Sequence, residues 1–306
     1  MGIYTRRVSL IPAPFEEALA LHVDGRSTLL AHGVTTAYWS YGPAQASTVI
    51  YFVHGFRGDH HGLESFASEL GDEYRCIIPD LPGFGESTDF VDTASIANYA
   101  AWLTDFIERT RANRRVILVG HSFGSIVVAA ALSQGLRVDS RVLINPIAKN
   151  ALAGPRGIMT RLAVFYYWLS SVLPERVGFA LLRSSVIVRV MSNTMAKTQD
   201  PDLRAWIHDQ HDHYFSHFGS RKAVLQAFRA SVSSDVSSYA NALHDPILLL
   251  VGDRDDITDI ETQMRFADSL PSATIVVAAG VGHLVHYEAY QWASDEIRRY
   301  ITKGVM

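Results

Sequence analysis

Short apolar runs alternate along this chain with longer stretches of helical periodicity. The runs each stop close to a glycine or a proline and span residues 47–53, 74–78, 115–119, 142–144, 247–251 and 274–277. They are apolar throughout, as expected of strands that are covered on both faces. Helical patterns follow at 93–111, 123–134, 260–270 and 288–301. This alternation predicts an α/β fold in which helices cover both sides of a mostly parallel sheet.

The alternation breaks once, between residues 147 and 243. Four helix-like stretches occur there, at 161–173, 177–191, 203–217 and 221–231, with no strand between them. We therefore expect a core domain built from 1–146 and 244–306, and a helical cap domain of 147–243 inserted after the sixth strand. Near the start, 20–23 and 35–41 are expected to form an antiparallel strand pair joined by a glycine-containing loop.

The composition is that of a globular protein, and the net charge bears on whether nucleic acid is a partner. Of 306 residues, 48% are hydrophobic and 19% charged, and the net charge of −4 gives no reason to expect nucleic-acid binding. A single cysteine cannot form an internal disulfide. No apolar segment follows Arg6-Arg7, and the longest apolar stretch, 162–173, is shorter than the about 20 residues that cross a bilayer. We expect a cytoplasmic protein without a membrane span; its oligomeric state stays open.

The strongest chemical signal is the segment Gly120-His121-Ser122-Phe123-Gly124, which has the pattern G-x-S-x-G. It directly follows an apolar strand and begins an alanine-rich helix, which is the context of a nucleophile elbow. Glycines are needed there because side chains in so tight a turn would clash with neighbouring backbone. Ser122 is therefore the candidate nucleophile, placed at a helix N-terminus that favours developing negative charge.

A base and an acid follow the last two strands, at the same edge of the sheet. His283 comes directly after a glycine-rich turn and is preferred over nearby His286 as general base. Asp255 is the preferred acid, with Asp253 second and more suited to bracing its loop. An acid could instead follow the sixth strand, but that position holds Asn145, which cannot carry the negative charge.

The loop after the third predicted strand supplies the remaining candidates. The backbone N–H groups of Phe56 and Phe123 are expected to form the oxyanion hole. We also expect substrate contacts from His54 and His121, and from the aromatic cap residues Phe165 and Trp168. An apolar cap favours an acyl or aryl substrate.

Together, HGFRG at 54–58, DLPGFGES at 80–87, GHSFG at 120–124, GDRDDIT at 252–258 and GVGH at 280–283 resemble the α/β-hydrolase superfamily. The resemblance covers about 20–146 and 244–303. It implies an eight-stranded, mostly parallel sheet with a helical cap, and it places the acid on Asp255 through a G-x-x-D loop. Relatives that use an aspartate nucleophile, the haloalkane dehalogenases and epoxide hydrolases, do not match Ser122. Ser125 departs from the pattern, since many members have a further glycine there.

These features favour a serine hydrolase that cleaves a carboxylic ester or thioester through an acyl-enzyme. C–C bond hydrolysis of a diketone-like substrate, perhydrolysis and non-catalytic ligand binding on the same fold remain alternatives. No cofactor is expected. His208, His211, His213 and His217 lie in one predicted cap helix; we interpret them as a solvated helix face and expect no metal site.

Overall fold

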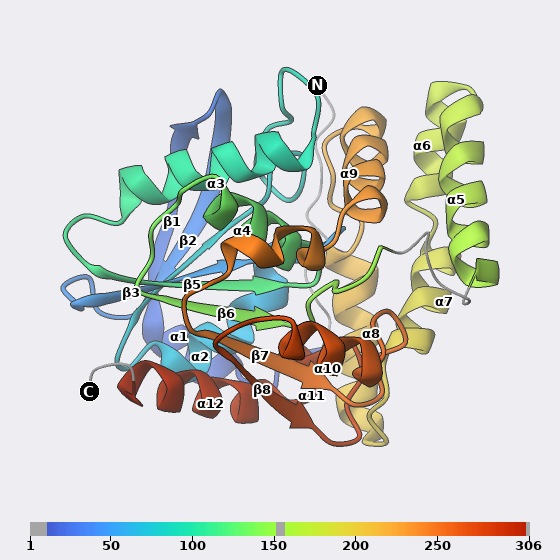
Figure 1. The fold of residues 1–306 in the computed structure, drawn as a ribbon. Helices are drawn as coiled ribbons and strands as arrows, with labels where there is room; N and C mark the ends of the chain where they lie inside the picture. The colour runs from blue at the N-terminus through green and yellow to red at the C-terminus, as the bar shows by residue number, and fades with distance from the viewer. Residues whose placement is uncertain (1–10, 151–156, 304–306) are drawn as a thin grey trace.

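The computed structural model describes residues 11–150 and 157–303, and these form one eight-stranded sheet with helices on both faces (Figure 1). The strand order is β1-β2-β4-β3-β5-β6-β7-β8. β1 and β2 pair antiparallel, β2 also pairs antiparallel with β4, and all other neighbours are parallel. The strands are β1 (Val23–Ala31), β2 (Val34–Tyr41), β3 (Thr48–Val53), β4 (Arg75–Pro79), β5 (Arg115–His121), β6 (Ser140–Ile144), β7 (Ile247–Gly252) and β8 (Ala273–Ala278).

Successive residues of each central strand enter two different cores, one on each face of the sheet. In β7, Ile247 and Leu249 join one core, whereas Leu248 and Leu250 join the other. This is why the strands are apolar at every position. The first face carries α3 (Ile96–Thr110), α4 (Phe123–Ser133) and α10 (Ile260–Asp268); the second carries α1 (Glu16–His22), α2 (Glu64–Leu70), α11 (Val285–Glu288) and α12 (Tyr290–Lys303).

The first hairpin differs from the expected one. Residues 20–22 end helix α1, and strand β1 begins at Val23 and continues to Ala31. It turns through His32 and Gly33, which both have positive φ, into β2. Most of β1 is exposed, so it lacks the buried, apolar pattern by which the central strands are recognised.

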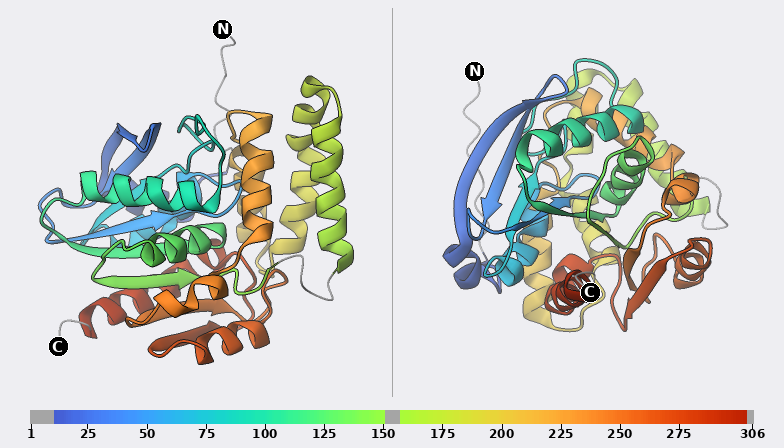
Figure 2. Two further views of the ribbon diagram at one scale, coloured as in Figure 1. Left: turned by 45° about the horizontal axis from the view of Figure 1, so that its top comes forward. Right: turned by 60° about the vertical axis from the view of Figure 1, so that its left-hand side comes forward.

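Among the described residues between β6 and β7, where the alternation of the sequence breaks, there are five α-helices and a 3-10 helix. They are α5 (Gly157–Val172), α6 (Glu175–Leu182), α7 (Ser185–Met195), α8 (Pro201–Tyr214), α9 (Arg221–Ser233) and η3 (Val236–Ala242). We call them the inserted helices. They stand beside the sheet, with α9 between the core and the α5–α6 pair (Figures 1 and 2). α8 contacts η1 (His60–Leu63), which follows β3, so the insertion reaches the loop of the predicted oxyanion hole.

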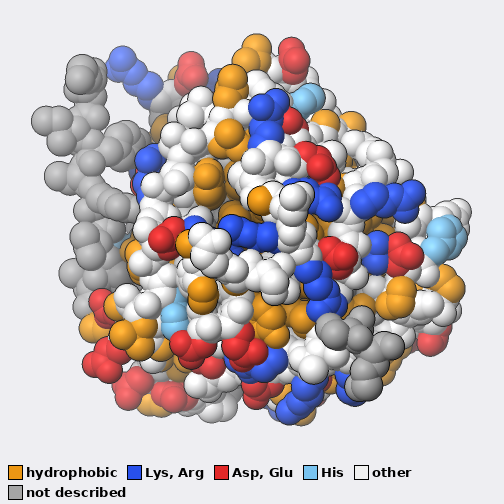
Figure 3. All heavy atoms as spheres, turned by 90° about the vertical axis from the view of Figure 1, so that its left-hand side faces the viewer, with side chains coloured by type: hydrophobic (Ala, Val, Ile, Leu, Met, Phe, Trp, Pro, Cys, Tyr) orange, Lys and Arg blue, Asp and Glu red, His pale blue; other side chains and the backbone are white. Residues whose placement is uncertain are grey.

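The surface carries charges of both signs. On the face seen in Figure 3, basic and acidic side chains are interspersed with apolar ones and do not gather into a field of one sign. None of the helices within 11–150 and 157–303 has the length and apolar character needed to span a bilayer.

Candidate active site

Ser122 occupies a strained turn between β5 and α4. Its φ is 54° and ψ is −120°, a conformation that non-glycine residues rarely adopt. The flanking glycines are required by the packing: a Cβ on Gly120 would lie 2.7 Å from the carbonyl oxygen of Gly124, and one on Gly124 would lie 2.1 Å from that of Val53. The turn therefore projects the serine hydroxyl out of the carboxyl edge of the sheet.

The structure brings the three sequence-predicted triad residues together. His283 Nε2 lies 2.8 Å from Ser122 Oγ, and its Nδ1 lies 2.8 Å from Asp255 Oδ2. This arrangement allows the imidazole to accept the serine proton while the carboxylate fixes its tautomer. The competing acid Asp253 instead accepts a hydrogen bond from the backbone of Gly280, at 2.7 Å, and so braces the loop before His283.

Asp255 is buried, and its surroundings keep it ionised. Burial alone would raise the pKa of Asp255, but the charge and hydrogen bond of His283, together with the N–H groups of Ile257 and Thr258, hold this pKa below its usual value. Asn145 adds a hydrogen bond from Nδ2 to Oδ2 of Asp255, at 3.0 Å. An ionised acid at this position can stabilise a protonated His283.

The loop after β3 lies against the serine. A Cβ on Gly55 would come within 3.2 Å of the Cβ of Ser122, so the close approach depends on this glycine. The N–H groups of Phe56 and Phe123 donate no hydrogen bond to any residue in the described ranges. Because these two N–H groups follow Gly55 and Ser122 and have no partner in the described ranges, they could donate to a developing oxyanion.

The chain matches the family model described as the alpha/beta hydrolase family over residues 50–296. It belongs to the alpha/beta hydrolase family. The fold agrees: a thermophilic esterase from Thermogutta terrifontis has a TM-score of 0.70 at 22% identity, over 92% of this chain and 99% of that one. An esterase from Exiguobacterium antarcticum has a TM-score of 0.73 at 15% identity, over 90% and 99%.

Curated relatives carry similar names. An uncharacterized hydrolase of Bacillus subtilis, YugF, is 25% identical over 88% of this chain and 95% of its own length. A putative esterase/lipase of Haemophilus influenzae is 24% identical over 84% of each chain. The expected family and fold are confirmed, and the match extends through the inserted helices.

Arg57 connects the loop after β3, which carries Phe56, to the inserted helices of this alpha/beta hydrolase. Its side chain is fully buried, its φ is +68°, and no carboxylate in the described ranges forms an ion pair with it. Instead the guanidinium donates to four oxygens: the carbonyls of Phe215 (3.2 Å) and Leu182 (2.6 Å) and the hydroxyls of Tyr167 (3.2 Å) and Ser216 (3.0 Å). The residue after Phe56 is thus bonded to three separate parts of the insertion.

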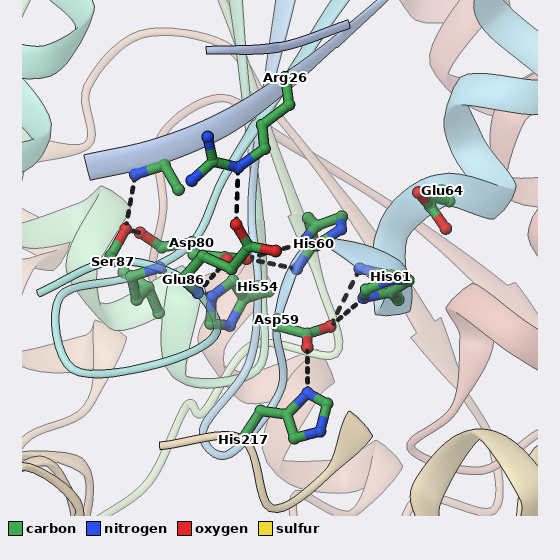
Figure 4. Close-up of polar contacts among 12 residues, drawn as sticks. Arg26, His54, Asp59, His60, His61, Glu64, Asp80, Glu86, Ser87 and His217 are labelled. Atoms are coloured by element: carbon green, nitrogen blue, oxygen red, sulfur yellow. Dashed lines mark hydrogen bonds and ion pairs between the residues drawn. The ribbon is translucent and has the colours of Figure 1, made fainter. Parts of the chain in front are cut away.

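Asp59 makes a second connection between the same loop and the insertion (Figure 4). Its Oδ1 lies 3.0 Å from Nδ1 of His61, and its Oδ2 lies 3.4 Å from Nδ1 of His217, which follows α8. Burial alone would raise the pKa of Asp59, but the charge of His61 holds it well below its usual value. Burial disfavours protonated His61, yet the attraction of Asp59 prevails and raises the pKa of His61 to about 9.

Asp59, His60 and His61 also place possible metal ligands within 4.8 Å of one another. These groups already bond to other side chains: His60 Nδ1 lies 2.9 Å from Asp80 Oδ1, and His61 Nδ1 lies 3.0 Å from Asp59 Oδ1. The rings of His60 and His61 are tilted by 37°, with centroids 3.8 Å apart. The buried carboxylate is already balanced by His61.

The histidines of α8 are not the solvated face expected from the sequence. His208 and His211 are buried, and Nδ1 of each lies within 2.7 Å of Ser192 Oγ on α7. His213 bonds to Asp209, whereas His217 lies beyond the helix, beside Asp59. Helical spacing could not show this, because the partners come from α7 and from the loop after β3.

A cavity of about 140 Å³ opens above Ser122. Its polar wall includes His54, His121, His211, His286 and Tyr287. The loop after β3 and six apolar side chains also line it: Leu63, Met191, Met195, Phe215, Ile257 and Leu284. Phe165 and Trp168 do not. Both lie 54% exposed on α5, and the inserted helices face the cavity with α7 and α8 instead. The expectation that these two aromatic residues contact substrate does not fit their placement.

His54 and His121 present little hydrogen-bonding capacity to a ligand. Nε2 of His54 accepts from the N–H of Leu81 at 2.9 Å, and its Nδ1 lies 2.9 Å from the carbonyl oxygen of Gly55. His121 uses Nε2 to bond to the carbonyl oxygen of His283, at 3.2 Å. Burial lowers the pKa of His121 to about 3, so its ring is a neutral part of the cavity wall.

Proposed function

We propose that this protein is a serine hydrolase that cleaves a carboxylic ester or thioester through an acyl-enzyme. One observation carries the proposal: His283 bonds to the strained Ser122 hydroxyl through Nε2 while Asp255 holds Nδ1, each at 2.8 Å. The N–H groups of Phe56 and Phe123, which follow Gly55 and Ser122 and have no partner in the described ranges, support it, as does the family membership of the chain.

The steps follow from the contacts. His283 takes the proton of Ser122 as the oxygen attacks the carbonyl carbon, and the N–H groups of Phe56 and Phe123 hold the oxyanion. His283 then protonates the leaving alcohol or thiol, which departs. A water that gives its proton to His283 attacks the acyl-enzyme, and Ser122 recovers its proton as the carboxylic acid leaves.

The cavity favours a short acyl group. An apolar protein cavity of roughly 150 Å³ is filled by one benzene molecule, and the cavity here measures about 140 Å³. An acyl chain of about four to six carbons occupies a similar volume. The inserted helices contribute Met191, Met195 and Phe215 to this space, and we propose that they act as a cap that limits the length of the acyl group.

The test is labelling with a fluorophosphonate probe, combined with turnover of p-nitrophenyl butyrate and octanoate. Wild-type protein should be labelled and should prefer butyrate. Ser122→Ala should lose labelling and about a millionfold in kcat. Ser133→Ala, on the same helix with its hydroxyl bonded to the carbonyl of Ala130, is the matched control. Equal labelling of wild type and Ser122→Ala would overturn the proposal.

A further inference from the structure

The cavity has a second group of polar side chains besides the triad. His211 comes from α8, whereas His286 and Tyr287 come from α11, and all three line the cavity. The ring of Tyr287 lies 5.7 Å from that of His211 and 4.1 Å from that of His286, measured between centroids. The insertion and the core therefore build one polar patch together, on the cavity wall.

These side chains have hydrogen-bonding atoms without partners. Nδ1 of His211 is occupied by Ser192 Oγ, at 2.7 Å, so Nε2 is the atom that its ring can offer to the cavity. Within residues 11–150 and 157–303, neither this atom nor the Tyr287 hydroxyl forms a hydrogen bond, so both can bond to a molecule in the cavity. Nδ1 of His286, a residue on the same wall, is buried without a partner. Buried polar groups in native proteins nearly always have a partner. This wall therefore suits a ligand that brings a polar atom to it.

The patch is polar but uncharged. Burial lowers the pKa of His211 to about 3 and, together with His121, holds the pKa of His286 well below its usual value. Burial also raises the pKa of Tyr287. Both imidazoles and the phenol are thus neutral near pH 7. Asp59 lines the same cavity, but protonated His61 balances its charge, so this pair adds no net positive charge that would attract an anion.

We propose that His211 and Tyr287 bind a hydroxyl or keto oxygen on the acyl part of the substrate. This inference rests on the proposed esterase function and specifies its substrate class as short hydroxyacyl or oxoacyl esters. Ser192 and His208 act as positioning residues that orient the His211 ring, since Ser192 Oγ lies 2.6 Å from Nδ1 of His208.

Specificity follows from the cost of leaving these groups unpaired. A site that is built to hydrogen-bond a substrate oxygen rejects an analogue without it, because its own buried groups then lose their partner. A purely apolar pocket discriminates only weakly against an added oxygen. The two kinds of cavity therefore predict different substrate ratios.

The experiment compares kcat/KM for two pairs of p-nitrophenyl esters: 4-oxopentanoate against pentanoate, and 3-hydroxybutyrate against butyrate. Each value is divided by the rate of hydroxide-catalysed hydrolysis, which removes the inductive effect of the added oxygen. Wild-type enzyme should favour the oxygenated member by at least about tenfold in one pair or both. Tyr287→Phe should bring that ratio close to one, and so should His211→Phe if the first variant fails to fold.

Tyr300→Phe is the matched control, because Tyr300 lies on α12 and does not line the cavity. It should keep the wild-type ratio. Equal turnover of both members by wild type, with no change in Tyr287→Phe, would overturn the subsite while leaving the esterase proposal intact. The p-nitrophenyl monoester of succinic acid is measured in the same way, and a preference for it over butyrate would show an anion site and overturn the neutral assignment. If wild type hydrolyses none of these esters, the esterase proposal itself fails.

Discussion

Asn145 and His283 contact the same oxygen of Asp255. Nδ2 of Asn145 donates to Oδ2 at 3.0 Å, and Nδ1 of His283 lies 2.8 Å from that atom. The amide also donates to the carbonyl of Gly282, at 2.9 Å, and Asn145 has a φ of 43°. Asn145 therefore fixes the position of both Asp255, the proposed acid, and the loop that carries His283, the proposed base.

Replacing Asn145 by alanine should slow turnover. A hydrogen bond to a charged group contributes about 1.5–3 kcal/mol, so kcat for p-nitrophenyl butyrate should fall by roughly 10- to 100-fold. Gln263→Ala, which removes another fully buried amide bonded to the carbonyl of Pro146, is the control and should keep a near-normal kcat. An unchanged kcat in Asn145→Ala would contradict the role assigned to this amide.

Asn145→Asp should shift the pH dependence of turnover. A second carboxylate beside Asp255 adds negative charge next to the imidazole, and this charge stabilises the imidazolium that forms during turnover. The acidic limb of the kcat/KM profile should therefore move to higher pH than in wild type. A profile that stays in place would show that the introduced carboxylate is protonated or has turned away.

Arg57→Met should destabilise the protein strongly. Methionine preserves much of the packing but leaves the buried carbonyls of Leu182 and Phe215 without a donor, at a cost of about 1–3 kcal/mol each. We expect the free energy of unfolding in urea to fall by about 3 kcal/mol. The surface pair of Arg26 with Glu86 is the control, and Arg26→Met should cost less than about 1 kcal/mol. Similar losses in the two variants would be inconsistent with the connection described.

The Asp59–His61 pair should make stability depend on pH in two directions. The pKa of His61 is raised to about 9, above its unfolded value of about 6.5, so its contribution is complete below pH 6.5 and is lost as the pH rises through 9. The lowered pKa of Asp59 makes its contribution complete above about pH 4 and lost as the pH falls further.

His61→Asn should remove the alkaline part of this dependence. The measurement is the free energy of unfolding in urea at pH 6.5 and pH 9, where wild type should lose more stability than the variant. His32→Asn, at an exposed turn, is the control and should behave as wild type. If wild type and His61→Asn decline equally between these pH values, another group is responsible.

Gly124→Ala should prevent normal folding. The added methyl would lie 2.1 Å from the backbone carbonyl oxygen of Val53, which cannot move without disturbing β3. Gly62→Ala is the comparison, because its Cβ would meet nothing nearer than the Tyr287 hydroxyl at 3.5 Å. Thermal unfolding should show a large loss of Tm for the first variant and little for the second. A native Tm for Gly124→Ala would contradict the packing argument.

The sequence predicted those parts of the fold whose cause is local. Central strands such as β5 and β7 are buried on both faces, so they appear as continuous apolar runs. The elbow at Ser122 was visible because its flanking glycines are required by the turn itself. The start of β1 was misplaced because most of that strand is exposed.

The remaining features depend on contacts between distant segments. The amide of Asn145 matters only because β7 and the loop before His283 close around it. His211 was assigned to a solvated face because helical spacing does not reveal that α7 lies beside α8. Phe165 and Trp168 looked like a cavity roof by composition, yet their side of α5 faces outward.

The bonds of Arg57 have a consequence for how an ester enters. An outward swing of the inserted helices would break these bonds or pull Phe56, the neighbouring residue and proposed oxyanion donor, away from Ser122. Under the proposed mechanism, a molecule large enough to push these helices outward would therefore also displace the oxyanion donor. We expect bulky esters to bind and yet react slowly, with a lower kcat.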